Sequence, residues 1–157
     1  MYSQGHLQGS LLFLWRQWWE AINMPKVGIH KPKKKFSSKV PELIKTQIKA
    51  GADTLVEKVL KPKYIELAPK SNDFNYLVDI FTKWYGNYFY FCSRYNCPSL
   101  RALSPSFEDK FARLEYGGPD IFSLAFKRHT GQWVEIYSEL SLEECLHEIE
   151  EGTYFIP

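Results

Sequence analysis

The stretch from Tyr76 to Tyr95 constrains the fold most, because it is dense in strand-forming residues and is interrupted only once. Tyr, Phe, Trp, Val and Ile crowd this stretch, and Gly86-Asn87 stands in its middle. A two-residue Gly-Asn connection is typical of a tight β-hairpin, since glycine adopts positive φ without steric cost and asparagine at little cost. The sequence therefore predicts two paired strands, at 75–85 and 88–95.

Three further strand patterns follow the hairpin. A proline-containing loop precedes them, and turn-forming residues at 117–120 and 130–131 separate them. Because short connections join neighbouring strands, we expect a five-stranded, mostly antiparallel meander sheet. The three predicted strands are Phe107–Tyr116, Ile121–His129 and Gln132–Glu139.

Helical patterns flank the predicted sheet. Apolar residues recur at helical spacing over about 40–60, with Gly51 as a predicted kink or break. Ser141 and Glu144 form the capping-box pattern of a short final helix at about 142–150, which Gly152 ends. The expected fold class is α+β, with N-terminal helices packed on the sheet and a short C-terminal helix closing it.

The N-terminal part of the chain has a different composition. Residues 1–23 contain a short amphipathic helix pattern at 11–22, and residues 24–38 contain two prolines, a glycine and five lysines, as in an extended linker. We therefore expect an extension at 1–23, a linker at 24–38 and one domain at 39–157. The tryptophan-rich pattern at 11–22 has three interpretations: a membrane-peripheral anchor, a helix docked on the domain, or an upstream addition before a start at Met24.

Charge is distributed unevenly along the chain. Residues 24–70 carry twelve lysines against four carboxylates, a local balance of +8, while residues 71–157 carry −6. Such a basic segment binds phosphate or an acidic partner, or is a solvated surface. The three cysteines are an odd number without disulfide-scaffold spacing, so we expect a reducing, cytoplasmic location.

One polar run is a candidate for acid–base chemistry. Strand alternation through Lys127–Trp133 would place Lys127 and His129 on one face of the sheet. Arg113, Glu135 and Tyr137 on neighbouring strands could approach His129, as in a small ribonuclease in which His or Glu moves protons and Arg holds phosphate. The alternative is cross-strand ion pairing on a solvated face. Phosphate-loop, nucleophile-elbow and zinc-protease motifs are absent, so we favour a protein without enzymatic activity.

A zinc site is the weakest of the chemical hypotheses. Cys92, Cys97, Cys145 and His147 offer four potential ligands, but Cys92 lies in a predicted strand and Cys145 in a predicted helix rather than in tight knuckles. We expect no metal and no cofactor, and we interpret the cysteines as small buried apolar residues.

The predicted hairpin combines aromatic with basic residues, as do sheets that bind single-stranded nucleic acid. The alternative is ordinary core and cross-strand packing of the rings. The expected function is a non-enzymatic binding or accessory protein whose partner is a protein or a nucleic acid. The candidate partner-binding residues are Lys33, Lys34, Lys35, Lys83, Trp84, Tyr90, Arg94, Lys127 and Arg128.

The C-terminal strands resemble a family of small bacterial proteins. The similarity lies in Phe111-Ala112-Arg113-Leu114-Glu115-Tyr116, in Phe122–Phe126, in Arg128–Trp133 and in Ile136-Tyr137. Over about residues 55–157 the chain is similar to these proteins, which are chiefly cyanobacterial and catalogued as hypothetical. The resemblance implies no activity and supplies no catalytic residues, and residues 1–23 fall outside it.

Overall fold

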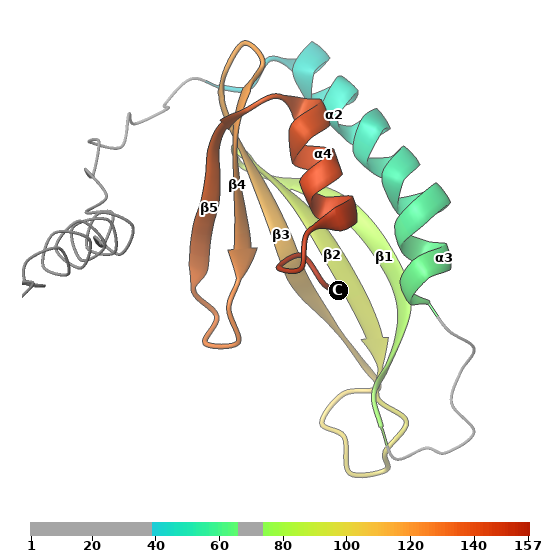
Figure 1. Ribbon diagram of the computed structural model, residues 1–157. Coiled ribbons are helices and arrows are strands. Elements are labelled where there is room, and N and C mark those ends of the chain that lie inside the picture. The colour runs from blue at the N-terminus through green and yellow to red at the C-terminus, as the bar shows by residue number, and fades with distance from the viewer. Residues whose placement is uncertain (1–38, 66–73) are drawn as a thin grey trace, which may run out of the picture. The chain divides into compact units, whose positions relative to one another are not determined.

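A computed structural model describes residues 39–65 and 74–157 (Figure 1). Five antiparallel strands form one sheet in the order β1-β2-β3-β4-β5, so each strand pairs with its neighbours along the chain. This arrangement confirms the predicted α+β fold with a meander sheet. The predicted extension and linker at 1–38 lie outside the described residues. The strands are β1 (Tyr76–Tyr85), β2 (Tyr88–Asn96), β3 (Ser106–Gly118), β4 (Ile121–Lys127) and β5 (Trp133–Leu140).

Tight turns set the register of the sheet. Tyr85 pairs with Tyr88 across Gly86 and Asn87, and Gly86 has a φ of 60°, which confirms the predicted hairpin. The predicted end of the fourth strand was wrong, because β4 stops at Lys127. The following residues form a turn in which the Arg128 amide donates to the Gln132 carbonyl at 2.8 Å. His129 therefore lies in an exposed turn, and strand alternation does not apply to it.

The first helical segment extends further than predicted, to Tyr64. α2 (Glu42–Leu55), the π-helix η1 (Val56–Leu60) and α3 (Lys61–Tyr64) follow one another without interruption. The predicted kink or break at Gly51 was wrong, because α2 continues through it. The irregularity occurs instead at η1, which ends two residues before Pro62, a residue that lacks the amide hydrogen that an α-helical ladder requires.

Gly51 has a packing role rather than a helix-breaking one. A Cβ atom at this position would lie 3.2 Å from Cδ1 of Leu146 in α4 (Leu142–Glu151), so the missing side chain lets the two helices approach closely. α4 begins with the predicted capping box, in which the Glu144 amide donates to Ser141 Oγ at 3.2 Å and the Ser141 amide donates to the Glu144 carboxylate at 2.8 Å. Gly152 follows its last residue, as predicted.

Both helical segments cover the same face of the sheet (Figure 1). The core lies between the helices and this face of the sheet. Its apolar side chains alternate along the strands with residues of the opposite face. No helix in the described part of the chain covers that opposite face, which we call the open face. Among the most deeply buried core residues are Ile48, Leu60, Ile80, Phe89, Phe91, Leu114, Leu124, Ile149 and Phe155.

Candidate functional site

The open face carries aromatic and charged side chains from all five strands. Phe89 and Phe91 of β2 belong to the core, so the intervening Tyr88 and Tyr90 belong to the open face. Cross-strand pairing extends this assignment, since Tyr90 pairs with Lys83 on one side and with Arg113 on the other. A half-covered antiparallel sheet normally presents polar residues on its uncovered face, whereas this one presents rings and cations together.

A β-bulge in β3 decides which cations reach the centre of the open face. Phe91 pairs with Ala112, but the next residue, Cys92, pairs with Lys110, so Phe111 is the extra residue of the bulge. In a regular strand, residues three apart point to opposite faces. Because the bulge adds one residue between them, Lys110 and Arg113 point to the same face of the sheet, the open face.

Arg113 and Lys110 each lie against two aromatic rings. The guanidinium carbon of Arg113 is 4.6 Å from the ring centroid of Tyr88 and 4.9 Å from that of Trp133. Nζ of Lys110 is 4.3 Å from the Tyr90 centroid and 5.6 Å from the Tyr85 centroid. These are cation–π distances. The aromatic–cationic cluster consists of Tyr85, Tyr88, Tyr90, Lys110, Arg113 and Trp133.

The two cations of this cluster differ from their neighbours in having no carboxylate partner. Among the described residues, neither Lys110 nor Arg113 forms an ion pair, and the buried Nε of Arg113 has no hydrogen-bond partner. By contrast, Lys83 and Arg94 both bind Glu108, at 3.0 and 2.9 Å. Hydrogen bonds from Arg94 and Lys83 lower the pKa of the Glu108 carboxyl.

Tyr90 is the buried tyrosine of the cluster. Tyr90 is 6% exposed although it lies on the open face, because Lys110 and Trp133 cover its ring. Desolvation raises the pKa of Tyr90, and the positive charge of Arg113 opposes that rise. Tyr90 therefore stays a neutral phenol at neutral pH, and the Lys110 ammonium lies above its ring.

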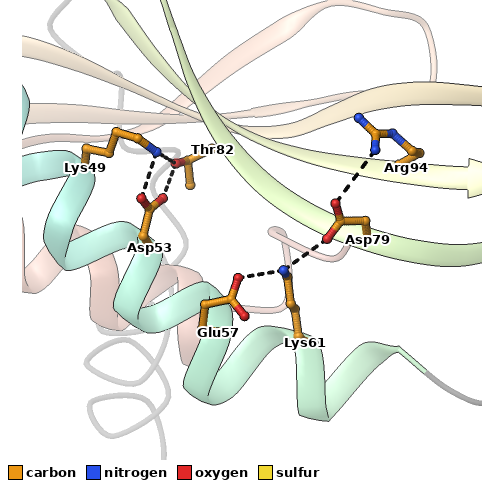
Figure 2. A network of polar contacts seen from close by, with 7 residues as sticks. All are labelled: Lys49, Asp53, Glu57, Lys61, Asp79, Thr82 and Arg94. Carbon is orange, nitrogen blue, oxygen red and sulfur yellow. Dashed lines mark hydrogen bonds and ion pairs between the residues drawn. The ribbon is translucent and has the colours of Figure 1, made fainter.

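A polar network connects the helices to the edge of the open face (Figure 2). Lys61 binds Glu57 at 2.6 Å and Asp79 of β1 at 3.1 Å, and Asp79 lies 3.9 Å from Arg94. The hydrogen bond to Glu57 is the main cause that raises the pKa of Lys61, and Asp79 adds to it. The sequence analysis did not find this network, because its members come from a helix and two strands and share no motif.

A second group of polar side chains, Lys49, Asp53 and Thr82, joins α2 to β1. The Thr82 hydroxyl donates to Asp53 at 2.5 Å, and Lys49 binds the other oxygen of Asp53 at 2.7 Å (Figure 2). Thr82 is buried, so its hydroxyl needs such a partner. This group holds the covered face together and contributes nothing to the open face.

The chain matches the model of a family described as a domain of unknown function, DUF3024, over residues 40–157. It belongs to this family. No curated protein and no solved structure gives a significant match. The predicted membership of an uncharacterised family is confirmed, and the matched range coincides with the described part of this DUF3024 chain except at 39 and at the gap 66–73.

The DUF3024 sheet separates the residues that the sequence analysis named for partner binding. Lys83, Tyr90, Arg94 and Lys127 lie on the open face, and Lys127 is paired with Asp109. Trp84 lies on the covered face, where it packs against the core and 5.8 Å below Nζ of Lys45. Arg128 lies in the exposed turn after β4. Lys33, Lys34 and Lys35 fall outside the described residues.

The four candidates for acid–base chemistry do not meet at one place. Arg113 and Glu135 are both cross-strand partners of Ala125 and share the open face. Tyr137 lies on the covered face, where the Glu148 carboxylate of α4 raises its pKa, and His129 lies in the turn. The geometry therefore assembles no shared proton-transfer site from Arg113, His129, Glu135 and Tyr137.

The cysteines, a surface hollow and the helices of the DUF3024 domain are the remaining places where a site could lie. Cys92 and Cys145 are buried on different elements, and the described residues contain no group of three or more metal-ligating side chains. A hollow of about 580 Å³ lies where β1 begins and β2 ends, and its lining includes Tyr76, Asn96 and Cys97. No described helix has the length and apolar character that a bilayer span requires, and the segment 11–22 lies outside the described residues.

Sequence reasoning missed Lys110, Trp133 and the bulge that brings them to Arg113. Lys110 stands inside an ordinary strand pattern, and Trp133 was noted only as the end of the polar run. The signal in the sequence is Phe111 beside Ala112, because these two successive apolar residues break the alternation of apolar and charged residues that runs from Ala112 to Tyr116.

Proposed function

We propose that this chain is a non-enzymatic binding protein that holds single-stranded nucleic acid on the open face of its sheet. The observation that carries the proposal is the aromatic–cationic cluster, in which Lys110 and Arg113 lack carboxylate partners and lie among four rings. Lysine and arginine bind backbone phosphates, and rings stack on bases at about 1–3 kcal/mol per base.

The shape of the surface favours a single strand over a duplex. Five strands spaced by about 4.8 Å span roughly 19 Å, whereas the major groove of duplex DNA is about 12 Å wide. A sheet of this width cannot enter the groove, but it can receive bases that are already unstacked. Tyr85 is 73% exposed and offers the most accessible ring of the cluster.

Negative charges on the open face restrict where a nucleic-acid strand would lie. Glu115 and Glu135 are also on the open face, as the partners of Tyr88 and Ala125. These carboxylates would repel phosphate. Glu115 lies in the cross-strand row of Tyr85 and Tyr88, and Glu135 lies in the row of Arg113 on β5. We therefore expect the nucleic-acid strand to lie over Tyr85 and Lys110 and to leave the β5 side of the face free.

Binding of labelled single strands of DNA and RNA by the full chain tests the proposal, with matched duplexes as competitors at low and moderate salt. We expect the single strands to bind more tightly, with an affinity that falls as salt rises. Absence of single-strand binding at low salt, or a preference for duplex, would overturn the proposal. Binding to an acidic protein surface would then explain the same cluster.

Tyr85→Ala tests the stacking contribution in the same assay. Because Tyr85 is exposed, its removal leaves the core intact, and a lost base contact of about 1–3 kcal/mol lowers affinity roughly 5- to 150-fold. Phe74→Ala is the matched control, since Phe74 is equally exposed at 73% and lies near the opposite end of β1. Equal losses in the two variants would argue against a specific stacking site at Tyr85.

We also propose a reducing, cytoplasmic location. All three cysteines are free, and desolvation raises the pKa of Cys145 to about 12 and raises that of Cys92 as well. Buried neutral thiols resist oxidation and are typical of proteins that never form disulfides. Fractionation of source cells with antibody detection checks the location.

A further inference from the structure

We propose that the bulge in β3 builds a phosphate subsite between Lys110 and Arg113. This inference rests on the proposed binding of single-stranded nucleic acid and deepens it, since it names one phosphodiester group as the ligand that both side chains share. The subsite depends on the bulge, because in a regular strand Lys110 and Arg113, which are three residues apart, would point to opposite faces of the sheet.

The spacing of the two cations suits one phosphate. Their cross-strand partners, Cys92 and Tyr90, are two residues apart on β2, which corresponds to about 7 Å along the strand. Charge-assisted hydrogen bonds to phosphate oxygens measure about 2.8 Å on each side. A phosphate group between the Lys110 ammonium, which lies 4.3 Å from the Tyr90 centroid, and the Arg113 guanidinium, whose charge acts on the same tyrosine, therefore contacts both cations.

Arg113 is oriented before any ligand arrives. Tyr88 and Trp133 lie 4.6 and 4.9 Å from its guanidinium carbon, and stacking of this kind occupies the faces of the group rather than its N–H edge. The buried Nε has no partner, and among the described residues no carboxylate pairs with the terminal nitrogens. A preoriented cation loses little rotamer freedom when it binds, which favours affinity.

The surroundings of Lys110 leave its charge available. Glu108, two residues earlier on β3, is already bound by Lys83 and Arg94 at 3.0 and 2.9 Å. The Lys110 ammonium instead lies above Tyr90, with Tyr85 5.6 Å away. A nucleotide whose phosphate sits between Lys110 and Arg113 therefore has the exposed ring of Tyr85 next to it as a surface for its base.

A double-mutant cycle on the full chain tests the shared subsite. The variants are Lys110→Gln, Arg113→Gln and the double variant, and the measurement is affinity for a single-stranded oligonucleotide across a series of salt concentrations. We expect each single change to lower affinity about tenfold or more, as for a lost charge-assisted hydrogen bond. We expect the double variant to lose less than the product of the two single losses, because both side chains hold the same group.

Two controls separate the subsite from general charge and from misfolding. Lys58→Gln removes the same charge from an exposed position on η1 of the helical layer, and we expect nearly unchanged affinity. Arg113→Lys keeps the charge but loses the planar stack, so it should retain the salt dependence while binding more weakly. Thermal melts followed by circular dichroism show that each variant is folded.

The outcomes distinguish the two proposals. If the wild type binds and the Lys110 and Arg113 variants bind equally well, the phosphate subsite is overturned while the proposed function stands. If the two single losses multiply in the double variant, the cations hold separate phosphates and the shared subsite is likewise overturned. If the wild type binds no single strand, the proposed function fails and the subsite fails with it.

Discussion

The two faces of the sheet use the same residue types for opposite purposes. On the covered face, Phe89 and Phe91 are fully buried under the helices, and their rings lie 5.7 Å apart in an edge-on arrangement. On the open face, Tyr88 and Tyr90 of the same strand lie beneath cations instead. Aromatic content alone therefore does not distinguish a core strand from a binding surface. What distinguishes the two faces is whether each ring packs against other apolar side chains or against a cation.

The largest expected effect comes from removing one ring from each face. Phe91→Ala should lower the free energy of unfolding by about 3–5 kcal/mol, because it leaves a cavity in a core that has no access to water. Tyr85→Ala should change it by about 0.5 kcal/mol or less, since Tyr85 is 73% exposed. Urea unfolding of both variants checks the contrast, and similar losses for both would show that the open face contributes to the core.

The next prediction concerns the covered face alone. Gly51→Leu should destabilise the domain by about 1–3 kcal/mol, because a Cβ at this position already lies 3.2 Å from Leu146. Gly51→Ala is the control and should stabilise by about 0.5 kcal/mol, since the gain in helix propensity exceeds the small shift required of the flexible Leu146 end. Thermal melts measure both, and nucleic-acid affinity of the folded variants should not change.

A smaller effect is expected at the capping box of α4. Ser141→Ala removes the acceptor of the Glu144 amide and should cost about 1 kcal/mol. Hydrogen bonds from Ser141 hold the pKa of Glu144 below its ordinary value of 4.5, so the stabilisation is present above that value and is lost as pH falls through the lowered pKa. The difference in melting temperature between wild type and Glu144→Gln should therefore shrink from pH 7 to pH 3, and a constant difference would contradict this assignment.

The sequence predicted features that depend on neighbouring residues but not the arrangement of the open face. The hairpin at Gly86-Asn87 and the capping box at Ser141 were predictable because each depends on residues adjacent in the chain. The partnership of Lys110 with Arg113 was not predictable, because it depends on the Phe111 bulge, and a one-residue shift in register reverses every later side chain.

The lack of tertiary information in the sequence also explains two wrong predictions, the break of the helix at Gly51 and the extension of the fourth strand to His129. Gly51 was expected to break α2, because intrinsic propensity disfavours glycine in a helix, but its close approach to Leu146 overrides propensity. His129 was expected to continue β4, whereas the turn closed by Arg128 and Gln132 begins two residues earlier than the glycine signal indicated. Both outcomes depend on tertiary or turn contacts that a linear pattern does not contain.

The smallest expected effect lies at the β1 edge, where the two faces meet. Asp79 lies 3.1 Å from Lys61 on the helical side and 3.9 Å from Arg94 at the margin of the open face, and its side chain is 34% exposed. Asp79→Asn should lower stability by less than about 1 kcal/mol, because partly exposed ion pairs contribute little and Arg94 keeps its contact with Glu108. Nucleic-acid affinity should rise slightly, since the change removes a negative charge near the proposed binding surface.

Urea unfolding and single-strand binding of Asp79→Asn measure this effect. The control is Glu57→Gln, which removes the other carboxylate partner of Lys61. Glu57 contacts Lys61 but has no ion pair with Arg94 among the described residues, so its loss should affect stability alone. Equal effects of both variants on binding would mean that the edge network transmits changes in the helical layer to the open face. A change in affinity confined to Asp79→Asn would instead mean that the open face acts through local charge, independently of the helices that cover the other side.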